Sequence, residues 1–108
     1  MKASDFCIIT TTTDTKENAD TITQTLLEKK LVACVQSSTI QSAYHWQGKI
    51  TNAEEIHLTM KTKRSLFKKV QTLIEQIHSY DVPEIIMVPL TGANTNYLQW
   101  LREETTDD

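Results

Sequence analysis

The fold is decided by residues 31–46, LVACVQSSTIQSAYHW, by the dipeptide Gln47-Gly48, and by residues 49–62, KITNAEEIHLTMKT. In the last segment Ile56, Leu58 and Met60 alternate with polar residues, which is the period of a β-strand with one buried face. We interpret residues 31–46 as a long strand, Gln47-Gly48 as a turn and residues 49–62 as the returning strand. The sequence therefore predicts an unusually long β-hairpin.

The predicted hairpin is too long for one small sheet. At about 3.3 Å per residue, residues 31–46 would extend roughly 50 Å, whereas typical strands have about 5–6 residues. We expect the ribbon both to bend at residues 37–39 and to project at its tip. Tyr44, Trp46 and Ile50 lie at that tip, and exposed apolar groups on a strand edge favour aggregation unless another chain covers them. We therefore expect oligomerisation through the hairpin; the alternative is a hairpin that folds back on its own core.

The segment before the hairpin predicts a strand and a helix. Residues 6–13 are rich in Ile and Thr, which is strand composition. Asp14 and Glu17 have the spacing of a capping box that opens a helix. Apolar residues then recur at helical spacing, and the helix is expected to end near Lys29-Lys30, where positive charge suits its dipole.

The segment after the hairpin predicts helix, strand and helix. Residues 66–77 carry a helical apolar stripe, which Pro83 and the residues before it interrupt. Residues 85–90 are almost continuously apolar, as expected of a central strand buried on both faces or at an interface. Residues 97–101 mark a short final helix, and we expect the acidic residues 103–108 to be frayed.

The order of elements predicts the fold class, which is α+β. Two right-handed strand–helix–strand crossovers in one sheet make a ferredoxin-like split βαβ sandwich, βαββαβ plus a C-terminal helix. The third strand then lies between the first and the second. This arrangement separates Cys7 from Cys34 by about 10 Å, too far for a disulfide.

Composition bounds the remaining possibilities. The chain has 108 residues, 39% hydrophobic residues and no linker, so we expect a single domain over residues 1–108. A net charge of -3 argues against nucleic-acid and anionic-membrane partners. We interpret the basic residues between Lys61 and Lys69 as the solvated first turns of a helix. No apolar run has the length of a signal peptide or a membrane span, so we expect a cytoplasmic protein with no membrane association.

Histidines provide the candidate metal ligands. Pairing about the turn places His45 opposite Ile50 and His57 opposite Ser38. The two histidines are then more than about 20 Å apart along the ribbon, too far to share an ion within one subunit. Both are therefore interpreted as surface or interface residues. His78 differs, because Tyr80, Asp81 and Glu84 follow it within six residues. Imidazole and carboxylate together suit Cu(II), Zn(II) or Ni(II); the alternative is a histidine that interacts with its helix dipole.

Catalytic signatures are absent from the sequence. It contains no G-x-S-x-G, no H-E-x-x-H and no glycine-rich phosphate loop, and its only glycines are Gly48 and Gly92. We therefore do not expect an enzyme.

Five motifs resemble one known family. They are LLEKKLVACV at residues 26–35, YHWQGKI at 44–50, EIHLTMKT at 55–62 with its closing Lys61-Thr62 pair, HSYDVPEI at 78–85 and NYLQW at 96–100. In this order and over residues 6–102, they resemble the CutA divalent-cation tolerance family. The resemblance implies a ferredoxin-like fold, a homotrimer similar to the PII signalling proteins, and a role in tolerance of divalent metals, copper especially.

The resemblance also assigns candidate residues. It places the metal ligands His78 and Glu84 in clefts between subunits. Four further cleft residues are implied: Lys61, Tyr80, Trp46 and Trp100. The expected trimer interface comprises Tyr44, Trp46, Ile50 and Ile85.

Two positions depart from the family pattern. Thr10 stands where some members have a cysteine proposed as a copper ligand, and the second histidine of a His-His pair found in some members is absent, since Ile77 precedes His78. Loss of the thiolate lowers the expected affinity for Cu(I). The metal hypothesis therefore depends on Cu(II) or another divalent cation at His78 and Glu84, with no cofactor required for folding. The alternatives are a PII-like trimer that binds a small anionic metabolite through Lys61 and a structural scaffold for partner proteins.

Overall fold

A four-stranded antiparallel sheet and three α-helices make up the computed structural model, which describes residues 1–107. The elements are β1 (Phe6–Thr13), α1 (Lys16–Glu28), β2 (Cys34–Trp46), β3 (Lys49–Lys63), α2 (Phe67–Ile77), β4 (Ile86–Pro89) and α3 (Thr95–Glu103), with short 3-10 turns η1 (Ala3–Asp5) and η2 (Arg64–Leu66). The sheet order is β2-β3-β1-β4. This confirms the ferredoxin-like α+β prediction and the place of the third strand between the first and second.

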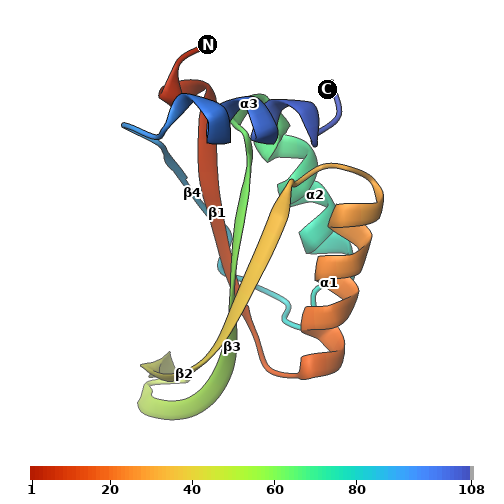
Figure 1. Ribbon diagram of the computed structural model, residues 1–108. Coiled ribbons are helices and arrows are strands. Elements are labelled where there is room, and N and C mark those ends of the chain that lie inside the picture. The colour runs from red at the N-terminus through yellow and green to blue at the C-terminus, as the bar shows by residue number, and fades with distance from the viewer. Residues whose placement is uncertain (108) are drawn as a thin grey trace.

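The helices divide the sheet into a covered face and an open face. Helices α1 and α2 lie side by side against one face, and α3 crosses one end of the sheet, near both termini (Figure 1). The main core lies under α1 and α2, where Leu58 and Met60 of β3 meet Ile22, Leu26 and Ile74. Burial of these side chains drives the packing of the two helices on the sheet.

The β2–β3 hairpin has the predicted register. Pairing runs without interruption from Cys34↔Lys61 to Trp46↔Lys49, and it includes His45↔Ile50. Gln47 and Gly48 have φ values of 50° and 76°, as a two-residue type I′ turn requires. The ribbon projects beyond the helices and curls close to its tip (Figure 1). Strand β2 begins three residues later than expected, and pairing stays intact through residues 37–39, the expected bend.

Helix α1 begins one residue later than the predicted capping box. Its N-cap is Thr15, whose side chain accepts a hydrogen bond from the Asn18 N–H. Asp14 is therefore not the cap; its carboxylate accepts a hydrogen bond from Ser79 instead. The helix ends at Glu28, next to Lys29-Lys30, where the sequence predicted its end.

Strand β4 is an edge strand, so the prediction of a central strand buried on both faces was wrong, and the alternative of a strand at an interface stays a prediction. It has only four residues, and its one partner is β1. Ile86 and Val88 are 49% and 54% exposed on the open face, whereas Ile85 and Met87 pack against the main core. The apolar run therefore reflects one buried face and one uncovered face.

The expected fraying of residues 103–108 was wrong where the structure describes them. Glu103 belongs to α3, and the buried Thr105 hydroxyl donates to the Leu101 carbonyl over 2.8 Å. The Thr106 N–H donates to the Lys30 carbonyl, and Lys63 Nζ donates to the carbonyls of Thr105 and Thr106. Position 108 lies outside the described residues.

Neither cysteine forms a disulfide within residues 1–107: Cys7 is buried, Cys34 is half-buried, and both thiols are free.

Within residues 1–107, no helix combines the length and hydropathy that crossing a membrane requires.

Candidate ligand-binding site

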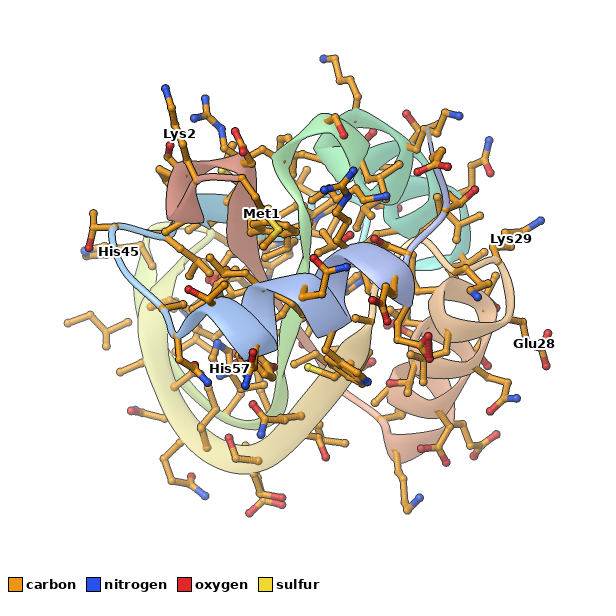
Figure 2. The ribbon with its side chains drawn as sticks, turned by 45° about the horizontal axis from the view of Figure 1, so that its top comes forward. Met1, Lys2, Glu28, Lys29, His45 and His57 are labelled. Atoms are coloured by element: carbon orange, nitrogen blue, oxygen red, sulfur yellow. The ribbon has the colours of Figure 1, made fainter. Side chains whose placement is uncertain are left out.

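The open face of the sheet carries the candidate site. Residues directly opposite on neighbouring strands point to the same face. Thr12, His57 and Ser38 therefore share one row, and Ile40 and Glu55 share the next. Because Leu58 and Met60 face the helices, the odd-numbered positions of β3 face the open side. Figure 2 shows His57 beneath α3, toward the inside of the curved hairpin.

A pocket of about 750 Å³ lies between the hairpin and residues 79–84. The hairpin supplies mainly apolar walls, and the other segment supplies polar groups. The lining residues are Thr12, Ile40, Ser42, Ala43, Tyr44, Trp46, Glu55, His57, Ser79, Tyr80, Asp81, Val82 and Glu84. Apolar walls with a few polar groups are typical of small-molecule sites.

Two lining residues of the pocket, Tyr80 and Glu55, are joined by a hydrogen bond. The Tyr80 hydroxyl donates to Glu55 Oε2 over 2.7 Å, and Glu55 is only 7% exposed. Burial and then the Glu55 hydrogen bond raise the pKa of Tyr80, so its proton stays on the phenol. Glu55 is not among the site residues predicted from the sequence. Its position two residues before His57, on the same face of the strand, was the available signal.

His78 positions Tyr80 rather than facing the pocket. Its Nδ1 accepts the Tyr80 backbone N–H over 3.0 Å, so Nε2 carries the proton and donates to the Thr12 carbonyl over 2.8 Å. The two rings are 5.0 Å apart. Both imidazole nitrogens are therefore occupied in this conformation, while Glu84, the other predicted metal ligand, lines the pocket. Within residues 1–107, no three His, Cys, Asp or Glu side chains cluster as a metal site.

A polar network fastens the segment after α2 to the start of α1. Ser79 Oγ donates to Asp14 Oδ1 over 2.7 Å, and this bond holds the pKa of Asp14 below its usual value. Asn18 accepts from the Thr13 hydroxyl over 2.7 Å and donates to the Ile77 carbonyl over 2.9 Å. These bonds fix the backbone on which Tyr80 stands.

Two of the four predicted cleft residues line the pocket and two lie outside it. Trp46 and Tyr80 line the pocket, with Trp46 61% exposed. Lys61 and Trp100 lie outside it: Lys61 Nζ donates to Gln36 Oε1 over 2.7 Å, and Trp100 stacks on Tyr97.

The four predicted interface residues also have different surroundings. Tyr44 and Trp46 line the pocket and Ile50, beside the hairpin turn, is 74% exposed, whereas Ile85 packs partly against the core. Thr10, the position of the missing cysteine, lies in β1 between Thr59 and Ile86.

Comparison with known proteins identifies the family. The sequence profile of the CutA1 divalent ion tolerance protein family matches residues 7–104. The chain belongs to this family. The CutA match covers nearly the same residues as the resemblance, and it confirms the expected family.

Individual CutA relatives are similar in sequence to this chain along most of its length. The divalent-cation tolerance protein CutA of Pyrococcus horikoshii is 37% identical over 98 residues, which cover 91% of this chain and 96% of that protein. The Thermus thermophilus protein of the same name is 37% identical, with the same coverage. A CutA homolog from Danio rerio is 40% identical and covers 86% of this chain, but this chain spans only 63% of that protein.

Solved CutA structures share the fold. CutA1 from Pyrococcus horikoshii has a TM-score of 0.90 at 35% identity, covering 94% of this chain and 99% of that one. CutA1 from Oryza sativa has a TM-score of 0.92 at 34% identity, covering 95% of each chain. A third CutA, from Archaeoglobus fulgidus, is described as periplasmic; its TM-score is 0.89 at 35% identity, over 92% of this chain and 97% of that one. The cytoplasmic location expected for this CutA family member stays a prediction.

Proposed function

We propose that this chain is a non-enzymatic, cytoplasmic homotrimer that takes part in tolerance of divalent cations, and that the pocket beside Tyr80 binds a small polar ligand. The names of the relatives support the role in cation tolerance. The observation that carries the assembly is the uncovered apolar surface: Trp46, Ile50, Ile86 and Val88 are 49–74% exposed. Large exposed apolar groups on sheet edges require a covering partner.

The ligand proposal rests on the chemistry of the pocket. Tyr44 and Trp46 offer flat apolar walls, and the Glu55–Tyr80 pair offers a buried acceptor with a fixed proton beside it. A polar ligand with an aliphatic or aromatic body fits this combination. Lys61, the cation first expected to hold an anionic metabolite, lies outside the pocket lining, so the ligand need not be an anion.

A thermal-shift screen of metabolites tests the ligand proposal. A ligand that binds the native state raises its melting temperature. Tyr80→Phe and Glu55→Gln should abolish the shift, because each breaks the central pair. Tyr97→Phe is the matched control: it removes a phenol outside the pocket and should retain the shift. A screen without any stabilising compound, or equal shifts in all variants, would count against the site.

Direct metal binding is the second candidate function, supported by the family name and by the Glu84 carboxylate on the pocket wall. In this candidate Glu84 and His78 hold Cu(II) or another divalent cation. His78 must first release the Thr12 carbonyl or the Tyr80 N–H. Titration calorimetry with Cu(II) and Zn(II) tests it: His78→Ala and Glu84→Ala should each lose the binding heat. Heats equal to those of the unchanged protein would remove this pair from consideration.

A further inference from the structure

A second cavity lies at the end of the sheet where α3 crosses, away from the hairpin tip. Its volume is about 760 Å³, and it is lined by Met1, Ser4, Asp5, Phe6, Lys63, Arg64, Ser65, Arg102 and Asp107. Figure 2 shows Met1 between the N-terminal turn, the end of β3 and α3. The cavity shares no lining residue with the pocket beside Tyr80, so inferences about it do not depend on the proposed function.

The charged groups of this cavity are unevenly paired. Asp5 accepts a hydrogen bond from the Lys2 backbone N–H over 2.8 Å, and Asp107 accepts from Lys63 Nζ over 3.1 Å. The same Lys63 amine also holds the carbonyls of Thr105 and Thr106. Both carboxylates and the lysine therefore already have partners.

The two arginines lack ion-pair partners within residues 1–107. Arg64 makes one hydrogen bond, to the Ser4 carbonyl over 3.2 Å, and neither Arg64 nor Arg102 forms an ion pair within residues 1–107. A guanidinium carries five N–H donors in a planar fork that matches oxyanions. The hydroxyls of Ser4 and Ser65 add donors to the same cavity. From the sequence, Arg64 is expected in the solvated first turns of a helix, whereas the fold places it in the same cavity lining as Arg102, near the C-terminus.

We propose that this cavity binds a phosphate group, held by the guanidinium groups of Arg64 and Arg102 with the hydroxyls of Ser4 and Ser65. Arginine suits phosphate better than lysine does, because its fork donates two parallel hydrogen bonds to one group. The phosphate is either the free ion or the head of a phosphate monoester. The cavity is several times larger than one phosphate, so it also has room for the remainder of a monoester.

The test is an NMR titration of the full chain with inorganic phosphate and with glycerol phosphate, at constant ionic strength against chloride. Saturable shifts at Ser4, Ser65 and Arg102 are expected. Arg64→Gln and Arg102→Gln should each weaken binding by about tenfold or more, because a charged hydrogen-bonding group is lost. Tighter binding of the monoester would identify the ester as the source, and equal binding would identify the free ion; either result supports the site.

The control is Lys68→Gln, which removes the same charge from an exposed position outside the cavity lining. It should leave phosphate binding unchanged. Arg102→Lys, which keeps the charge but loses the fork, should bind with intermediate affinity. Linear shifts that do not saturate, or equal weakening by Lys68→Gln, would overturn the proposal. All variants change exposed side chains, and their spectra report directly whether they are folded.

Discussion

Two threonines on the helix-facing side of the sheet differ in one hydrogen bond. Both are fully buried, but the Thr62 hydroxyl donates to the Leu31 carbonyl over 2.6 Å, whereas the Thr11 hydroxyl has no partner within residues 1–107. A buried hydroxyl without a partner costs about 1–3 kcal/mol. Thr11→Val should therefore raise the free energy of unfolding by about 1 kcal/mol, and Thr62→Val should lower it by about 1–3 kcal/mol. Urea unfolding of both variants measures the difference; destabilisation by Thr11→Val would contradict the assignment.

Alkaline pH should destabilise the native chain. Burial raises the pKa of Cys7 from 9.0 to about 11, and burial with the Cys34 hydrogen bond raises that of Tyr97 from 10.0 to about 12. The pKa of Tyr80 is raised as well. Between about pH 9 and 12 the unfolded chain therefore binds fewer protons than the native one, so the free energy of unfolding falls as pH rises. Urea unfolding at increasing pH checks this sign. Tyr97→Phe should flatten the slope near its upper end.

The residues of the candidate site could be predicted from the sequence only in part. Tyr80 and Glu84 of the HSYDVPEI motif both line the pocket, and their roles there stay predictions. The motif could not indicate that backbone groups occupy both nitrogens of His78, since Thr12 is 66 residues away in the chain. Glu55 was missed because a single acidic residue in a strand normally faces solvent. The Tyr80 hydroxyl, which the fold brings to Glu55, supplies the hydrogen bond that this buried carboxylate needs.

Among the elements, helix α1 ends in an arrangement that favours glycine. The Leu31 N–H bonds the Leu26 carbonyl and the Lys30 N–H bonds the Leu27 carbonyl, which together form a Schellman motif. Lys30 has a φ of 56°, a conformation that costs a non-glycine residue about 1–2 kcal/mol.

Lys30→Gly should therefore raise the free energy of unfolding by about 1 kcal/mol. Lys29→Gly is the matched control. Lys29 has a φ of -82°, so glycine there adds only chain entropy and should destabilise by about 0.5–1 kcal/mol. Thermal unfolding of the pair separates the two effects, and a loss of stability in both variants would contradict this account of the helix end.

The elements also show which features local sequence can predict. The hairpin register was predictable because a two-residue turn fixes every pair that follows it, from Trp46↔Lys49 onward. The burial of β4 could not be predicted, because an apolar run has the same sequence pattern whether the strand is buried on both faces or covered on only one face at an edge. The C-terminal residues were likewise misjudged, since Lys63 and Lys30, which anchor them, are distant in sequence.

For the whole molecule, the central claim is that one chain leaves an incomplete surface. The hairpin extends the molecule to 45 Å against 26 and 21 Å in the other directions. Ile50 lies at its tip, and Ile86 and Val88 lie on the open face of the sheet. Burying such groups contributes about 25 cal/mol per Å² of apolar surface, so three copies that cover one another gain more than a single chain can.

Native mass spectrometry of protein purified without affinity metals tests this claim most directly. The account predicts one dominant species with three chains of 12.3 kDa each, which Ile50→Lys combined with Val88→Lys converts to single chains. A dilute solution of the unchanged protein that contains only stable 12.3 kDa particles would contradict it.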